Sequence, residues 1–231
     1  MLSGNLDREI LLAFNSLAGD DTLLWGLGNN GLIRGFAIFF PLVALWFAGD
    51  SIERRSRMLA GLIAVCLATL LSVWCQFHLD IHLRPLLDPT LPLKIVNPQW
   101  ATLWDRTGSF PSDTATLFFS LSTVVFLENR LIGLFCCLWA AAIVTLPRVI
   151  FGWHYPSDII GAAILGSGSV FLFEKIPYLR VLLERLLILF EGRRYLVHAL
   201  LFIFLAEASN LFSSLQQMEK YFVRMIHSYF S

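Results

Sequence analysis

Apolar residues run in long blocks along this chain, and charged residues gather between the blocks. A transmembrane helix needs about 20 mostly apolar residues to cross a hydrocarbon core about 30 Å thick. Two of the blocks are short by this measure, so their helices are expected to extend into the flanking polar residues. The pattern predicts an all-α integral-membrane bundle of about six transmembrane helices, near 32–49, 58–78, 114–127, 131–150, 159–173 and 195–212.

Two further segments mix charged and apolar residues and are expected to form interfacial amphipathic helices. Residues 1–30 lack a long apolar core after a basic start, so an interfacial N-terminal helix is expected there rather than a cleaved signal peptide. Residues 176–194 carry too many charges to span a bilayer comfortably. Since no internal repeat or linker divides the chain, residues 1–231 are expected to form a single domain.

The composition favours a membrane protein. Hydrophobic residues make up 57% of the chain and charged residues 15%, whereas soluble domains have roughly 45–50% apolar residues. The 17 basic and 17 acidic side chains balance, and the basic ones form no dense patch. The lipid bilayer is therefore an expected partner and nucleic acid is not. The four cysteines all lie in apolar segments, where a free thiol packs as a small hydrophobe.

Lysine and arginine concentrate in three connections, at 54–57, at Arg130 and across 175–194. Short cytoplasmic loops retain positive charge, so these connections are expected on the inner side of the membrane. With six crossings, both termini, the loop at 79–111 and the short loop around His154 then lie on the outer side. The polar residues of these two loops are thereby brought to one face.

The segment LPRVIFGWHYPSD places an arginine, a histidine and an aspartate at the end of an apolar run. Pro156 and Ser157 form a helix-start signal, so Asp158 is expected in the first turn of the fifth crossing with His154 just before it. A carboxylate on one ring nitrogen leaves the other nitrogen available as a general base or nucleophile. Arg148 adds donors suited to phosphate oxygens. The alternative is that these side chains only anchor a helix end.

Two more polar stretches are expected on the same face. Arg84 and Pro85 lie at the outer end of the second crossing, and Ser112, Asp113 and Thr114 begin the third. A helix N-terminus with free N–H groups binds anions, although Ser, Asp and Thr are also common N-caps. Three such stretches on one face indicate a phosphate site.

These stretches resemble the three motifs of the type 2 phosphatidic acid phosphatase family of membrane lipid phosphatases and phosphotransferases. The family motifs are Lys, six residues, Arg-Pro; then Pro-Ser-Gly-His; then Ser-Arg, five residues, His, three residues, Asp. Asp113 in place of the glycine resembles a variant seen in polyprenyl-diphosphate phosphatases. The matching positions are Arg84 and Pro85; Pro111 and Ser112; and Arg148, His154 and Asp158, with Pro147 in place of the serine.

The resemblance implies a metal-independent phosphatase or phosphotransferase without a cofactor, in which His154 attacks phosphorus and forms a phosphohistidine. Arg84, Arg148 and the N–H groups near Ser112 neutralise the charge on phosphate in that scheme, and Asp158 orients the histidine. The substrate implied is a phosphorylated lipid, and the location implied is a bacterial inner membrane with the site facing the periplasm.

Two departures from the family bear on the mechanism. Phe77 stands where the family has its lysine, and Thr114 stands where it has the histidine that protonates the leaving group. Loss of a general acid costs on the order of 10²–10⁴ in rate. The loss matters less when a phosphate leaves than when an alkoxide leaves, so a lipid diphosphate, such as a polyprenyl diphosphate, is the expected substrate.

Other residues leave alternatives open. His78 and His82 follow the position of the missing lysine and could donate to phosphate, and His82 or Asp113 could act as an acid. His78, Asp80 and His82 could also bind a divalent metal, although no metal is expected. Glu207, midway along the sixth block, is either functional, or the helix is displaced, or Glu207 faces a polar contact with Ser209 or Asn210. A catalytically weak carrier of a phosphorylated lipid and a small transporter are the rival functions.

Overall fold

The computed structural model describes residues 4–19, 30–49, 51–79, 83–97 and 108–212. Within these residues the chain is helical apart from turns, loops and one isolated antiparallel bridge between Leu83 and Gly108. The elements are α1 (Asn5–Asn15), α3 (Gly31–Phe47), α4 (Ile52–His78), η1 (Pro85–Leu87), α6 (Asp113–Glu128), α7 (Arg130–Trp139), η2 (Ala140–Thr145), α8 (Leu146–Ile150), α9 (Pro156–Glu174), α10 (Pro177–Leu189), η3 (Glu191–Arg193) and α11 (Arg194–Ser209).

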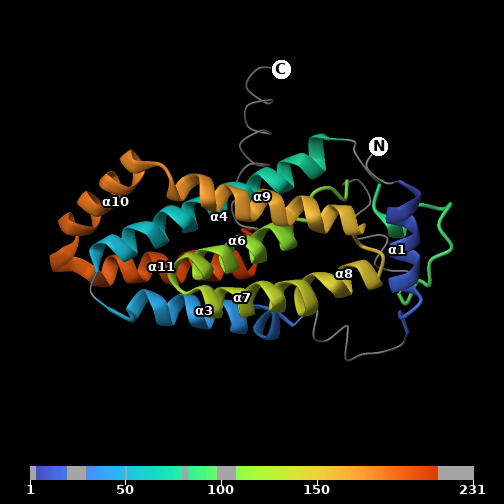
Figure 1. The fold of residues 1–231 in the computed structure, drawn as a ribbon, viewed down its shortest axis with the longest axis horizontal. Coiled ribbons are helices and arrows are strands. Elements are labelled where there is room, and N and C mark those ends of the chain that lie inside the picture. Colours follow the sequence, from blue (N-terminus) through green and yellow to red (C-terminus); the bar gives the residue numbers. More distant parts are fainter. Residues whose placement is uncertain (1–3, 20–29, 50, 80–82, 98–107, 213–231) are drawn as a thin grey trace, which may run out of the picture.

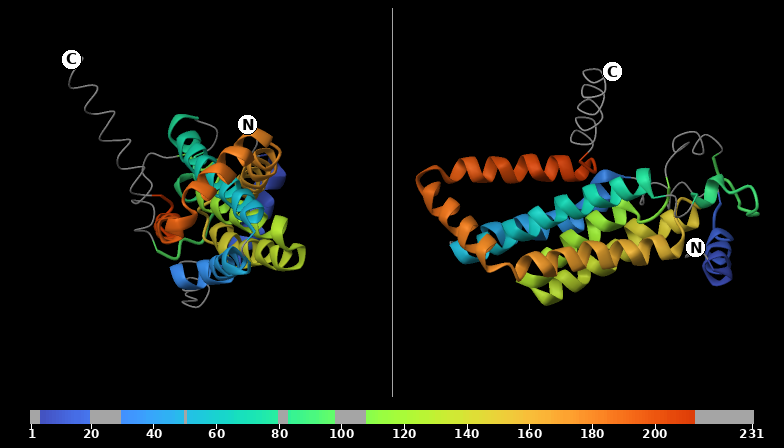
Figure 2. Two further views of the ribbon diagram at one scale, coloured as in Figure 1. Left: turned by 90° about the vertical axis from the view of Figure 1, so that its left-hand side faces the viewer. Right: turned by 90° about the horizontal axis from the view of Figure 1, so that it is seen from above.

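The helices α3, α4, α6, α7, α9 and α11 run roughly along the long axis of the molecule (Figure 1). Helix α10 closes one end of the bundle, and α1 lies across the opposite end (Figure 2). The expected amphipathic segments at 1–30 and 176–194 thus each contain a helix at an end of the bundle. Their position on a membrane surface stays a prediction.

Every predicted apolar block contains a helix, which confirms the all-α bundle. Among the described residues, three helices are long and apolar enough to cross a membrane: Ile52–His78, Arg130–Ile150 and Pro156–Glu174. Ile33–Phe47 is a shorter apolar helix, and α6 and α11 have 16 residues each. At 1.5 Å per residue, 16 residues span about 24 Å, so these helices fall short of the hydrocarbon thickness. The count of six crossings stays a prediction.

Helix α6 lies in the middle of the bundle and packs against α3, α4, α7 and α9. Its buried side chains include Leu117, Leu121 and Val125, none of which is exposed to solvent. A glycine permits the close approach to α9, because a Cβ added at Gly166 would lie 2.5 Å from the backbone oxygen of Thr116. Since α6 begins and α4 ends beside α9, the ends of three helices meet near His154.

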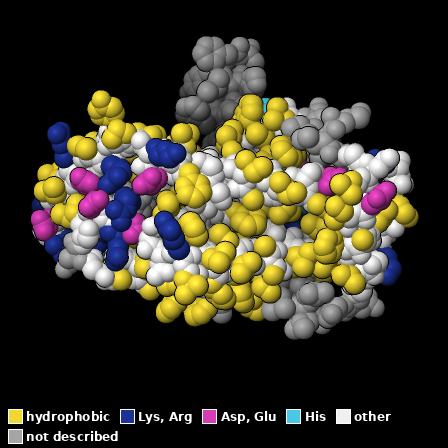
Figure 3. All heavy atoms as spheres, in the orientation of Figure 1, with side chains coloured by type: hydrophobic (Ala, Val, Ile, Leu, Met, Phe, Trp, Pro, Cys, Tyr) yellow, Lys and Arg dark blue, Asp and Glu magenta, His cyan; other side chains and the backbone are white. Residues whose placement is uncertain are grey.

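The outer surface of the bundle is apolar, as a membrane protein requires. Leu131 is 79% exposed and Ile164 is 70% exposed, and hydrophobic side chains cover the middle of the face drawn in Figure 3. Charged side chains gather near the two ends of that face, most densely at the α10 end. At that end Glu128 of α6 pairs with Arg54 at 3.3 Å and with Arg57 at 3.2 Å, which ties α6 to α4.

The helix that carries Arg148 is continuous from Arg130 to Ile150 but contains a π-helical stretch, Ala140–Thr145. Pro147 lacks an N–H group, and in a regular α-helix its ring would clash with the carbonyl one turn earlier. A π-helical turn before a proline relieves such a clash and rotates the residues that follow. The π-helical stretch therefore accommodates Pro147, which directly precedes Arg148.

Candidate active site

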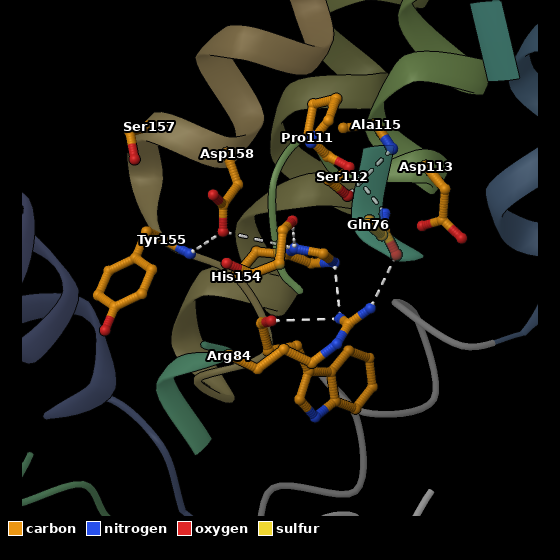
Figure 4. A network of polar contacts seen from close by, with 12 residues as sticks. Gln76, Arg84, Pro111, Ser112, Asp113, Ala115, His154, Tyr155, Ser157 and Asp158 are labelled. Carbon is orange, nitrogen blue, oxygen red and sulfur yellow. Dashed lines mark hydrogen bonds and ion pairs between the residues drawn. The ribbon is translucent and has the colours of Figure 1, made fainter. Parts of the chain in front are cut away.

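The candidate site lies at the α1 end of the bundle, where segments distant in sequence meet. His154 stands in the turn between α8 and α9, and Asp158 lies in the first turn of α9 (Figure 4). Arg84 directly precedes η1, and Ser112 is the N-cap of α6. The three predicted stretches therefore form one cluster, as the sequence pattern suggested.

The histidine is buried and its orientation is fixed. His154 is 1% exposed, and its Nδ1 lies 3.0 Å from the carbonyl oxygen of Ser109 and 3.6 Å from Oδ2 of Asp158. A carbonyl oxygen can only accept, so Nδ1 carries the proton and Nε2 carries the lone pair. The ring is thus held in the tautomer that a nucleophilic histidine needs.

The second ring nitrogen of His154, Nε2, accepts from a guanidinium group. Nη1 of Arg84 lies 3.3 Å from Nε2 of His154 and donates 3.4 Å to the carbonyl oxygen of Trp153. Figure 4 shows the arginine pointing from the η1 segment toward the imidazole. A phosphate that accepts from Arg84 is thereby placed next to the lone pair of Nε2.

Burial lowers the pKa of His154, and it outweighs the neighbouring Asp158, which acts in the opposite direction. The imidazole is accordingly neutral at neutral pH, as a nucleophile must be. Burial also lowers the pKa of Arg84, against the opposing effects of Asp113 and Asp158, but a guanidinium remains protonated.

Asp158 is fully buried and has two structural partners besides the histidine. Its Oδ2 accepts from the backbone N–H of Tyr155 at 2.8 Å, which caps the start of α9. Its backbone oxygen accepts from the N–H of Ser112 at 3.3 Å and joins the starts of α6 and α9. The carboxylate of Asp158 therefore orients His154 and caps α9, while its backbone oxygen holds the start of α6 beside them.

Arg148 is 8% exposed, and its guanidinium lies 5.5 Å from the ring centroid of Trp153. Its Nε is buried and has no hydrogen-bond partner in the part of the chain that the structure describes. Trp153 is 3% exposed and packs against Phe151 and this guanidinium. The turn before α9 therefore directs the indole of Trp153 inward, against Arg148.

The start of α6 is capped by its own side chains. Ser112 Oγ accepts from the N–H of Ala115 at 3.4 Å, and Asp113 Oδ1 accepts from the N–H of Thr114 at 2.6 Å. The hydroxyl of Thr114 donates 3.3 Å to the same oxygen. Asp113 also interacts electrostatically with Arg84 and Arg148. Ser112, Asp113 and Thr114 thus belong to the cluster, with Asp113 standing among its cations.

Gln76 is a site residue that the sequence pattern missed. Its Oε1 accepts from Arg84 Nη2 at 3.0 Å, and its Nε2 donates to the carbonyl oxygen of Pro111 at 2.7 Å. The neighbouring Phe77, at the position of the family's lysine, is 48% exposed. The motif spacing points to residue 77, but the last turn of α4 directs residue 76 inward.

The structure does not bring His78 together with Arg84 and His154. The His78 ring is exposed and stacks on Trp74 at a centroid distance of 4.8 Å. His82 and Asp80 lie outside the described residues. Within the part of the chain that the structure describes, no group of three or more His, Cys, Asp or Glu residues could hold a metal ion.

Two further ionisable residues can be placed. Tyr155 adjoins His154, but burial raises its pKa to about 12, so its phenol is too weak an acid to protonate a leaving group at neutral pH.

Glu207 lies in the last turn of α11 rather than midway along a helix, and its backbone oxygen accepts from Asn210 and Phe212. The observed helix end favours the structural alternative for Glu207.

Helix α1 supports the site through two polar side chains that also escaped notice in the sequence. Asp7 accepts from the N–H of Ser157 at 3.0 Å and from its hydroxyl at 2.7 Å. Asn15 Nδ2 donates 2.9 Å to the carbonyl oxygen of Ile150. These bonds hold both ends of the turn that carries His154.

A helical membrane bundle with a buried histidine, a carboxylate behind it and guanidinium groups in front of it defines a membrane protein built for phosphate chemistry. The model of the PAP2 superfamily matches residues 61–181, more than half of the chain. The chain belongs to this superfamily, and the match covers every site residue placed above except those on α1.

Individual relatives carry related names. Undecaprenyl-diphosphatase BcrC of Bacillus subtilis (strain 168) is 26% identical over 175 residues, which cover 73% of this chain and 82% of that protein. The bacitracin transport permease protein BcrC of Bacillus licheniformis is 37% identical over 85 residues, covering 36% of this chain and 41% of that protein. YbjG of Escherichia coli (strain K12), provisionally named an undecaprenyl-diphosphatase, is 31% identical over 130 residues, covering 54% and 60%. No solved structure gives a significant match.

Proposed function

We propose that this protein is a membrane phosphatase that removes the terminal phosphate of a polyprenyl diphosphate through a phosphohistidine at His154. The observation that carries the proposal is the arrangement of the imidazole. Nδ1 is tied to Ser109 and Asp158, and Nε2 presents its lone pair toward Arg84. The names of two relatives, one an undecaprenyl-diphosphatase and one provisionally named so, support the choice of lipid.

In the first step, Nε2 of His154 attacks the terminal phosphorus in line with the bridging oxygen. The phosphorus–oxygen bond breaks, its electron pair stays on the bridging oxygen, and polyprenyl phosphate leaves. Arg84 and Arg148 neutralise the charge on the transferred phosphoryl group, which is the main contribution that a protein makes to this reaction. The phosphorylated imidazole is cationic, and the Asp158 carboxylate stabilises it.

In the second step, water attacks the same phosphorus, releases phosphate and restores the neutral His154. The chemistry uses no cofactor or metal. A lipid alcohol or phosphate in place of water gives phosphoryl transfer, so the geometry suits hydrolysis and transfer equally.

The residue at position 114 favours a lipid diphosphate over a lipid monophosphate as the substrate. Thr114 is 1% exposed, and its hydroxyl donates to Asp113, so it offers no acidic proton at neutral pH. An alkoxide leaving group needs such a proton far more than a phosphate does, and loss of the acid costs on the order of 10²–10⁴ in rate.

We place the site on the outer face of the membrane, in a bacterial inner membrane. The cationic connections gather at the α10 end, which includes Arg54, Arg57 and Arg180, and short cationic loops stay inside. Single cysteines can be introduced at exposed Thr90 and at Gly192 in a variant of the protein without its four native cysteines. In intact cells, the cysteine at position 90 should react with a membrane-impermeant maleimide, and the cysteine at position 192 should not. The reverse pattern places the site inside.

The test of activity is phosphate release from a polyprenyl diphosphate by purified protein, with His154→Ala as the matched variant. The proposal predicts turnover by the wild type, none by the variant, and trapping of acid-labile phosphate only on the wild type. Equal rates on lipid monophosphates and diphosphates contradict the choice of substrate.

A carrier of phosphorylated lipid is the second candidate, and the threonine at position 114 is the observation that favours it. A carrier binds the lipid diphosphate tightly and releases no phosphate. The same assay separates the two functions.

A further inference from the structure

One cation near the site lies outside the segment that matches the superfamily. Arg34 belongs to α3 (Gly31–Phe47), which packs against α6 and α7. Its guanidinium carbon lies 6.0 Å from the ring centroid of Phe118, about one and a half turns into α6 from Asp113. The Nε of Arg34 is buried and has no hydrogen-bond partner among the described residues.

The charges around Arg34 leave the site with an excess of positive charge. Arg34, Arg84 and Arg148 all interact electrostatically with the single carboxylate of Asp113, and Arg34 and Arg148 repel each other. Asp158, the other carboxylate of the cluster, is engaged with His154 and the start of α9. Two guanidinium groups that repel each other, each with a buried Nε that makes no hydrogen bond to the described residues, are costly to hold unless an anion compensates them.

The surroundings of Arg34 also suit a lipid. An apolar groove of about 630 Å³ runs between α3 and α7, with Ala37 and Pro41 of α3 and Phe135 and Trp139 of α7 among its lining. Arg34, Ala37 and Pro41 follow the i, i+3, i+7 spacing of one helical stripe. Arg34 therefore begins the helical stripe to which Ala37 and Pro41 of the groove belong.

We propose that Arg34 binds the lipid-linked phosphate of the diphosphate and neutralises it as it leaves, with the first isoprene units in the groove between α3 and α7. This inference rests on the proposed function. Arg84 and His154 hold the terminal phosphate, so the lipid-linked phosphate must find its own cation.

The role of Arg34 follows from the chemistry of the leaving group. When the bond between the terminal phosphorus and the bridging oxygen breaks, the lipid-linked phosphate gains one negative charge. The family histidine at position 114 would supply a proton, but Thr114 supplies none. A fixed guanidinium stabilises the same developing charge without a proton transfer, and it acts only when the leaving group is a phosphate. Arg34 thereby makes the site selective for diphosphates.

The test compares two probes in the His154→Ala background, where binding is separated from turnover. The probes are farnesyl methylenediphosphonate, which keeps both phosphorus centres, and inorganic phosphate. Addition of Arg34→Gln should weaken diphosphonate binding by about 10- to 100-fold, the range for one charged hydrogen bond, and should change phosphate binding by less than about threefold. Exposed Arg193→Gln is the matched control and should change neither.

Kinetics with active protein supply the second readout. Arg34→Gln should lower kcat on a polyprenyl diphosphate, and Arg34→Lys, which keeps the charge, should retain an intermediate rate even if the glutamine variant folds poorly. Unchanged diphosphonate binding overturns the inference, and so does an equal loss for both probes, because that result places Arg34 on the terminal phosphate. If the wild type binds the diphosphonate but releases no phosphate from a polyprenyl diphosphate, the proposed function is wrong while the inference about Arg34 stands.

Discussion

Oε1 of Gln76 accepts a hydrogen bond from Nη2 of Arg84 at 3.0 Å, and the same amide donates 2.7 Å to the carbonyl oxygen of Pro111. One neutral side chain therefore connects the end of α4, the guanidinium that faces His154, and the loop that enters α6. Gln76 is 6% exposed, so both bonds are shielded from water. The amide fixes the guanidinium of Arg84 without compensating its charge, which leaves that charge for phosphate.

Removal of the Gln76 amide should impair catalysis more than folding. Gln76→Leu leaves the buried Arg84 Nη2 without this acceptor, so we expect kcat/KM to fall about 10- to 100-fold, as for loss of a buried charged hydrogen bond. Steady-state kinetics on a polyprenyl diphosphate measure the effect, and Gln76→Glu is the informative partner. Its carboxylate retains the acceptor but neutralises Arg84, so it should also be slow.

Position 77 provides a matched control for the motif. Restoring the family's residue with Phe77→Lys should raise the rate by less than about twofold, because Phe77 is 48% exposed and Gln76 occupies the inward place. A large gain of activity in Phe77→Lys would show that the end of α4 rotates in the working enzyme, contrary to the observed contacts.

The sequence predicted much of this architecture because hydrophobic blocks and helix-start signals are local. Arg84, Arg148, His154 and Asp158 were found because their motif spacings survive in this chain. Gln76 was missed because its role depends on the rotation of the last turn of α4, and a single-residue error in that rotation moves the inward place from 76 to 77. No local pattern reports such a rotation.

The residues contributed by α1 and α3 were missed for a different reason. Asp7, Asn15 and Arg34 act across long sequence separations, and Asp7 reaches Ser157, 150 positions away. Each lies in an amphipathic or apolar segment where a polar side chain has many ordinary explanations. Only the packing of these helices against α6, α8 and α9 identifies their partners.

Asp158→Asn should slow the enzyme without abolishing its activity. The carbonyl oxygen of Ser109 holds Nδ1 of His154 at 3.0 Å, closer than the carboxylate at 3.6 Å, so the tautomer survives the substitution. The variant loses the negative charge that stabilises the cationic phosphohistidine, which should lower kcat about 10- to 100-fold. Rapid-quench measurement of the phosphoenzyme tests this: a loss as complete as that of His154→Ala means that Asp158 alone sets the tautomer.

The pH dependence follows from the lowered pKa of His154. The nucleophile is active when neutral, so kcat/KM should hold its plateau down to below pH 6.5 and fall only at lower pH. Asp158 raises the pKa of His154, so the acidic limb should move to still lower pH in Asp158→Asn. The stability of the protein changes with pH in the same direction as its activity. As pH falls below about 6.5, His154 is protonated in the unfolded chain before it is protonated in the folded chain, so this contribution to the free energy of unfolding is lost. An acidic limb above pH 7 contradicts the prediction.

Thr114→His should restore the missing acid and widen the substrate range. We expect at least a tenfold gain on a lipid monophosphate and little gain on a diphosphate, since only the alkoxide needs the proton. Thr114 is 1% exposed, so a thermal unfolding curve must accompany the kinetics. Thr114→Val is the control: it removes the hydroxyl bond to Asp113 and should give no gain. Equal gains on both substrates contradict the leaving-group argument.

The link between α1 and α9 should matter for catalysis as well as stability. Asp7 is 9% exposed and caps the second residue of α9, one position before Asp158. Asp7→Ala should reduce stability by about 1 kcal/mol, as loss of a helix cap does, and should lower kcat because Asp158 and the His154 turn become less fixed. Asp7→Asn keeps one acceptor oxygen and should recover most of both losses. If Asp7→Ala lowers the melting temperature while kcat below that temperature stays at the wild-type value, α1 stabilises the bundle but does not position the histidine.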